Sequence, residues 1–137
     1  MKHFPFHLLA VAASVAAAAL PAHAEGDAAA GKQLYAARCA ACHSVEYNGV
    51  GPTHKNLIGR RAGTAQGYTY SNALKNSSVI WGPDTLSRWL TDPEKFIPGQ
   101  KMFVSVPDAK ERADLVAYLL QAGRPQPSTS RQPGAMK

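Results

Sequence analysis

The stretch Cys39-Ala40-Ala41-Cys42-His43 decides how this chain folds. Two cysteines with two residues between them present their sulfur atoms on one side of a helical turn, where each can bond a vinyl group at the edge of a haem. The histidine that follows is then held beneath the ring, where an imidazole nitrogen can bind iron. This spacing is typical of c-type haem attachment. It predicts one haem c bound covalently through Cys39 and Cys42, with His43 as an iron ligand.

Three other uses of the two cysteines fit the sequence less well. A zinc site needs a fourth ligand and usually a second cysteine or histidine pair, and His54 is the only other histidine after residue 24. A thioredoxin-like redox pair needs a βαβ setting, which this sequence lacks. A disulfide across so short a loop would stabilise the fold little and would leave His43 without a role.

The second axial ligand of the iron is predicted to be Met102. It lies in the segment Ile97-Pro98-Gly99-Gln100-Lys101-Met102, a constrained loop that can hold a thioether against iron. Histidine with methionine is a known axial pair for haem. Met136 lies one residue from the end of the chain, in a stretch predicted to be solvated, and His54 is the rival ligand, although its neighbours predict an exposed loop histidine. The other interpretation of Met102 is that it fills a gap in the core.

Residues 1–24 are predicted to be a secretory signal peptide. A short basic head with Lys2 precedes the almost wholly apolar stretch 8–20, and Ala22-His23-Ala24 fits a small-x-small cleavage site. An uncleaved membrane anchor is the alternative, but about a dozen apolar residues are few for crossing a bilayer. We therefore expect an exported protein, periplasmic or in a similar oxidising compartment, without stable membrane insertion.

The charge pattern argues against nucleic acid as a partner. The 15 basic and 9 acidic residues give a formal net charge of +6, but the basic residues are scattered, and Arg60-Arg61 is the only adjacent pair. A nucleic-acid surface gathers basic residues on one face. A mildly positive protein is expected to meet acidic surfaces of partner proteins instead.

The rest of the sequence predicts an all-α domain over residues 25–123. The expected helices run from Asp27 towards Cys39, from Ser71 through Lys75, from Asp84 to Pro93, and from Asp108 to Gly123. The segment 93–107 holds three prolines and is predicted to be a constrained loop, and 124–137 a disordered tail. Four short helices leave too little apolar surface for a firm core, and a large apolar cofactor at the centre would supply it.

A longer series of residues follows the attachment motif in a characteristic order. The series consists of Gly51-Pro52, Gly59-Arg60, Gly67-Tyr68-Thr69-Tyr70-Ser71, Trp81, Pro93, the segment 97–102, and Leu115 to Tyr118. In order and spacing it resembles the class I cytochromes c, the family of mitochondrial cytochrome c and its small soluble bacterial relatives. The similarity covers about Asp27 to Gln121. It implies a class I cytochrome c fold, in which three to five short helices wrap around one covalently attached haem.

The resemblance also implies roles for individual residues. Pro52 is expected to offer its carbonyl to the free nitrogen of His43, which orients the ring. Gly31 of the first helix is expected to approach the last helix closely, near Leu115. Hydrogen bonds to the haem propionates are expected from four residues, namely Arg60, Tyr70, Ser71 and Trp81.

The function implied by the resemblance is that of a monomeric one-electron carrier rather than an enzyme, which passes electrons between redox proteins with acidic docking surfaces. Three alternatives stay open at this point: a ligand-binding haem protein with an open sixth site, an interaction module whose haem is structural, and a dedicated haem subunit of one multi-subunit redox enzyme.

Glu94 and Gln100 are among the departures from the mitochondrial pattern. Glu94 occupies a position that is basic in mitochondrial members, although Arg38, Lys95 and Lys101 remain of the basic ring used for docking. Gln100 stands where those members have a threonine that bonds a propionate. An amide at position 100 could take over the bond to the propionate, and the identity of the partner stays open.

Overall fold

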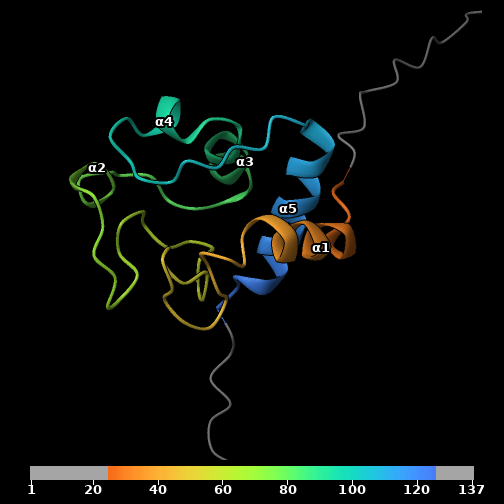
Figure 1. Ribbon diagram of the computed structural model, residues 1–137, viewed down its shortest axis with the longest axis horizontal. Coiled ribbons are helices and arrows are strands. Elements are labelled where there is room, and N and C mark those ends of the chain that lie inside the picture. Colours follow the sequence, from red (N-terminus) through yellow and green to blue (C-terminus); the bar gives the residue numbers. More distant parts are fainter. Residues whose placement is uncertain (1–24, 126–137) are drawn as a thin grey trace, which may run out of the picture.

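The computed structural model describes residues 25–125. The predicted signal peptide and residues 126–137 of the predicted tail lie outside the described residues. Five helices form in this order: α1 (Ala28–Arg38), α2 (Asn72–Lys75), α3 (Pro83–Thr91), α4 (Pro93–Phe96) and α5 (Ala109–Ala122) (Figure 1). Between residues 25 and 125 the only β feature is a single bridge from Arg61 to Ile80, so the predicted all-α class is confirmed. In the same range, none of the helices has the length and apolar character needed to cross a membrane.

The predicted helix starts are marked by capping side chains. Asp27, Ser71 and Asp108 each accept a hydrogen bond from a backbone N–H in the first turn of the following helix, from Ala29 (2.8 Å), Leu74 (3.3 Å) and Glu111 (2.8 Å) respectively. The third helix, α3, begins one residue earlier than predicted, at Pro83, with Gly82 as its N-cap. A proline fits this first position because the N–H that it lacks would have no helical partner there.

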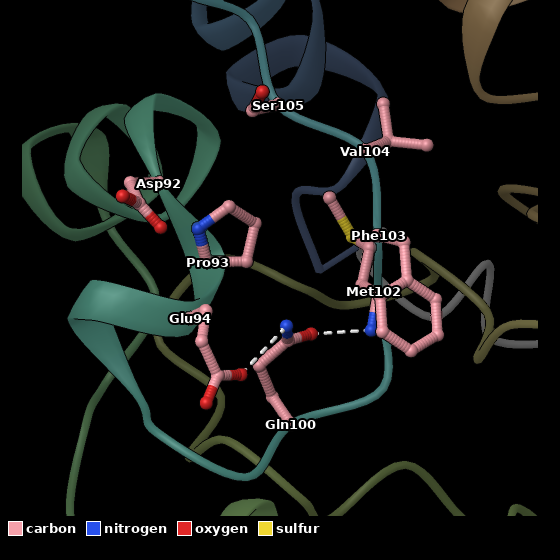
Figure 2. A pocket seen from close by; sticks show the side chains of 8 residues that line it. All are labelled: Asp92, Pro93, Glu94, Gln100, Met102, Phe103, Val104 and Ser105. Carbon is pink, nitrogen blue, oxygen red and sulfur yellow. Dashed lines mark hydrogen bonds between the residues drawn. The ribbon is translucent and has the colours of Figure 1, made fainter.

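The segment after α3 differs from the continuous loop that the sequence predicted. Pro93–Phe96 form the single-turn helix α4 because the Asp92 side chain accepts from the Lys95 N–H at 3.0 Å and a proline occupies the first helical position. Aspartate followed by proline is a helix-start signal that the prediction overlooked. From Ile97 to Pro107 the chain has no regular secondary structure and runs beside a cavity of about 290 Å³, which Met102 helps to line (Figure 2).

The first and last long helices, α1 and α5, cross closely, as predicted. A Cβ atom on Gly31 would lie 1.9 Å from the carbonyl oxygen of Asp114, so only glycine permits this approach. The neighbouring Leu115 is fully buried, with 0% of its surface exposed. The rings of Tyr35 and Tyr118 pack across the same crossing, with 5.1 Å between their centroids. The two helices therefore form one unit that supports the attachment motif at the end of α1.

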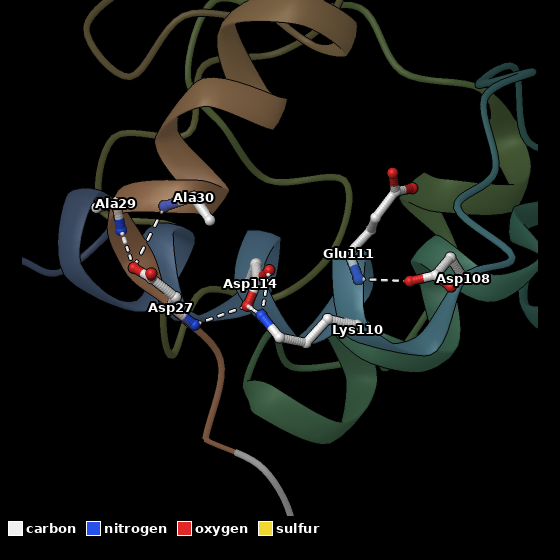
Figure 3. Close-up of polar contacts among 7 residues, drawn as sticks. All are labelled: Asp27, Ala29, Ala30, Asp108, Lys110, Glu111 and Asp114. Atoms are coloured by element: carbon white, nitrogen blue, oxygen red, sulfur yellow. Dashed lines mark hydrogen bonds and ion pairs between the residues drawn. The ribbon is translucent and has the colours of Figure 1, made fainter.

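A buried carboxylate ties the start of α1 to α5. Asp114 accepts hydrogen bonds from the Asp27 backbone N–H at 2.7 Å and from Lys110 Nζ, which lies 2.7 Å from each carboxylate oxygen (Figure 3). The bond from Lys110 and the bond from Asp27 hold the pKa of Asp114 below its usual value, although burial opposes this shift. The charged form of Asp114 is thus the form that the folded protein favours.

We expect Asp114→Asn to lower the thermal unfolding midpoint by a few degrees at neutral pH, because an amide keeps the bond from Asp27 but loses the charge opposite Lys110. A depressed pKa stabilises the fold above the pKa of the unfolded chain, and the contribution disappears as the pH falls through the pKa of the folded protein. The difference in midpoint between the two proteins should therefore shrink in acid. Calorimetry from neutral to strongly acid pH measures it, and a difference that grows in acid would contradict the assignment.

Candidate functional site

The attachment motif forms a tight turn directly after α1. Cys39 is the C-cap of the helix, and its carbonyl oxygen accepts from the backbone N–H of Cys42 at 3.0 Å and of His43 at 2.8 Å. The two cysteines are not joined to each other, so both sulfur atoms are available for other bonds. Burial raises the pKa of the Cys39 thiol to about 11. This turn brings the three side chains together as the sequence predicted.

The His43 ring is held with one nitrogen free. Its Nδ1 lies 2.8 Å from the carbonyl oxygen of Pro52. A carbonyl can only accept, so Nδ1 carries the hydrogen and Nε2 keeps its lone pair. Burial lowers the pKa of His43, although the bond to Pro52 opposes the shift, and this direction favours the neutral ring, the form that binds a metal. A Cβ atom on Gly51 would lie 2.3 Å from the ring, so the loop needs glycine here.

His54 lies against His43, and the expectation of an exposed loop histidine is wrong. The two rings stack with 4.4 Å between their centroids, and the Tyr35 hydroxyl lies 3.1 Å from His54 Nδ1. Burial, with smaller electrostatic effects of the neighbouring His43 and Arg60, lowers the pKa of His54 to about 3. Its neighbours in the sequence gave no sign of this, because its contacts come from α1 and the attachment turn.

Four polar side chains predicted to face the propionates are partly or fully buried. Two nitrogen atoms of Arg60 donate to the carbonyls of Lys55 at 2.5 Å and Thr53 at 2.8 Å. The oxygen atoms of Tyr70 and Ser71 accept bonds from the backbone N–H groups of Ala65 and Leu74 respectively, so each O–H hydrogen is left to donate. Trp81 is buried and meets the Trp89 ring edge to face, with 5.5 Å between centroids.

The described residues fit a haem. Arg60 Nε is one of two buried side-chain nitrogen or oxygen atoms in residues 25–125 that have no hydrogen-bond partner, and a carboxylate such as a propionate would satisfy it. Burial lowers the pKa of Arg60, because the charged guanidinium is poorly solvated there, while Tyr70 opposes this shift. A bound anion would stabilise the charge on Arg60. Met102 is partly buried and packs against the core. With His43 Nε2 free and two free thiols at the attachment spacing, the donor set is that of haem c.

Known proteins are similar to this chain in sequence and in fold. The family model described as cytochrome c matches residues 28–123. The chain belongs to the cytochrome c family. Cytochrome c of Sesamum indicum is 45% identical over 101 residues, which cover 71% of this chain and 91% of the relative. Cytochrome c of Chlamydomonas reinhardtii is 46% identical over 101 residues, with 71% and 90% covered.

A solved structure extends the likeness to the fold. Cytochrome cH from Methylobacterium extorquens is 49% identical, with a TM-score of 0.67, and the match covers 70% of this chain and 99% of that one. Cytochromes c carry a covalently attached haem c and transfer electrons rather than act as enzymes, and this chain has Cys39 and Cys42 at the required spacing. The predicted family, fold class and cofactor are confirmed.

One basic residue of the expected docking ring is already paired in this cytochrome c. Arg38, in the last turn of α1, donates to both carboxylate oxygens of Glu111 on α5, at 2.7 and 2.9 Å. The pair neutralises the charge that a partner would otherwise meet at Arg38. Lys95 and Lys101, which flank the loop before Met102, are both exposed. Of these three residues, Lys95 and Lys101 form no ion pair within residues 25–125.

Proposed function

We propose that this cytochrome c is a periplasmic one-electron carrier whose haem iron is bound by His43 and Met102. The observation that carries the proposal is the free Nε2 of His43, which the Pro52 carbonyl orients from the opposite side of the ring. Met102 is the only methionine among residues 25–125, and it lies in the constrained loop after α4. Histidine and methionine together are the axial pair that raises the reduction potential in cytochromes c.

The chain's own residues would hold the group and set its potential. When bound, haem c supplies an iron that gains or loses one electron. The thioether of Met102 is a weaker donor to ferric than to ferrous iron, and the buried site disfavours the additional positive charge of the ferric form. Both effects favour the ferrous form, so we expect a positive reduction potential. Hydrogen bonds to the propionates are proposed for Arg60, Tyr70, Ser71 and Trp81.

The proposed location and partners follow from the sequence and the surface charge. Residues 1–24 carry the pattern of a signal peptide cleaved near Ala24, which supports export of a mature chain with its domain over residues 25–123. Lys95 and Lys101 are exposed, and Phe103 is 92% exposed, so we propose that the partner is a redox protein with an acidic surface. A free monomeric carrier should bind such a partner weakly and lose the complex at high salt.

The proposal is tested on the protein purified from its native host. Mass analysis should find a chain that begins after residue 24 and carries one haem through two thioether links. Absorption spectra should show low-spin iron with the weak red band of an iron–sulfur bond, and voltammetry should show a reversible one-electron couple. An unmodified polypeptide would overturn the whole proposal, and high-spin iron that binds carbon monoxide readily would overturn Met102 as the ligand.

A further inference from the structure

The Gln100 side chain joins the methionine loop to α4. Its Oε1 accepts a hydrogen bond from the backbone N–H of Met102, and its Nε2 donates to Glu94 Oε2 at 3.2 Å (Figure 2). The other carboxylate oxygen of Glu94 accepts from the Gly99 N–H at 2.9 Å. Glu94 therefore reaches the start of the loop directly and its end through Gln100.

Chemistry fixes the direction of each bond. The Met102 N–H can only donate and the Glu94 carboxylate can only accept, so the Gln100 amide satisfies both in one orientation alone. Gln100 is only 6% exposed, which makes an unpaired amide costly at this place. A bond to a carboxylate is also stronger than one between neutral groups. The two side chains thus hold the backbone at the first and the last residue of the segment 99–102.

This arrangement brings together two of the positions at which the sequence departs from the mitochondrial pattern. Gln100 replaces a threonine that bonds a propionate, and Glu94 replaces a basic residue. In this chain the two replacements face each other, and the amide is directed towards α4 through Glu94. The methionine loop is thus held by hydrogen bonds within the protein and not by a bond from position 100 to a propionate.

We propose that Glu94 and Gln100 are positioning residues that keep the Met102 loop closed, so that its sulfur stays on the iron. This inference rests on the proposed ligation by Met102. Loop opening exposes the sixth position to outside ligands, and the apparent affinity of such a ligand rises with the fraction of open molecules. The pair should therefore lower the affinity of the ferric protein for imidazole, which displaces the methionine.

Exchange of the two residues gives a sharp test with the holoprotein. Glu94→Gln leaves one acceptor oxygen for two donors, the Gly99 N–H and Gln100 Nε2, and Gln100→Glu places two carboxylates opposite each other. The double variant E94Q/Q100E restores all three bonds. Its amide at position 94 can accept from the Gly99 N–H and donate to the carboxylate at position 100, which can also accept from the Met102 N–H. Glu46→Gln is the matched control. Glu46 is exposed, its ion pair is with Lys55, and it forms no bond to the segment 99–102.

We expect each single variant to bind imidazole about three- to tenfold more tightly than the wild type, the range of one lost hydrogen bond. The double variant and E46Q should match the wild type. Two results would overturn the proposal: equal imidazole affinities in all five proteins, or a double variant whose gain in affinity equals the product of the gains of the two single variants. The red band of the wild type would in either case still report Met102 ligation. A wild type without that band would overturn Met102 as the ligand and this inference with it.

Discussion

Met102→Ala should convert a low-spin iron with the weak red absorption band into one with an open sixth position that binds carbon monoxide. Alanine has no atom that can reach and bind the iron, whereas the thioether of Met102 favours the ferrous form. Removing it should lower the reduction potential by on the order of a few tenths of a volt, since axial ligands set haem potentials over a range of about 0.8 V. Absorption spectra of both oxidation states and voltammetry of the purified holoprotein measure the two effects.

Two further variants separate ligation from packing. Met102→Leu keeps nearly the same apolar volume in the partly buried position but removes the sulfur, so its spectrum should change as that of M102A does. Met136→Ala should leave the spectrum unchanged. If M102L kept the red band and the low-spin spectrum, Met102 would be a packing residue, and the rival ligand His54 would have to be tested by its own substitution.

The parts of the fold that could be predicted are those in which local chemistry decides. The attachment motif lies within one turn, and its bonds run between residues close together in the chain. The caps Asp27, Ser71 and Asp108 accept from N–H groups two or three residues ahead, so the local sequence alone marks these helix starts. Such interactions do not depend on how distant segments pack.

Two of the contacts that were missed depend on distant segments. His54 stacks on His43 because the loop from Gly51 folds back beneath the attachment turn, and its neighbours in sequence do not encode that contact. The Arg38–Glu111 pair joins residues 73 positions apart. Pairings of this kind follow from tertiary packing, which a single sequence does not display. The Gln100 amide and Glu94 are only six residues apart, and their contact was missed for a local reason, because the prediction did not include the turn of α4.

Gly31→Ala should reverse the usual effect of this substitution in a helix. Alanine is a better helix former than glycine by about 1 kcal/mol, so propensity alone predicts a more stable protein. At Gly31, however, the new Cβ would lie 1.9 Å from the backbone oxygen of Asp114 and 2.9 Å from the Tyr118 Cβ. A backbone atom cannot move aside by changing rotamer, so α1 and α5 must separate around the fully buried Leu115. We expect a net loss of about 3 kcal/mol in the free energy of unfolding.

Ala36→Gly in the same helix makes the comparison quantitative. Ala36 is exposed, so the substitution should cost only the propensity difference of about 1 kcal/mol. Denaturant unfolding of the three holoproteins, followed by helix circular dichroism, gives both values. If G31A were the more stable protein, the helices would not approach as closely as the structure shows. We expect both variants to lose stability, with the larger loss at Gly31. Contact between α1 and α5 then outweighs the helix propensity of residue 31, because the absence of a side chain on Gly31 is what lets the two helices meet.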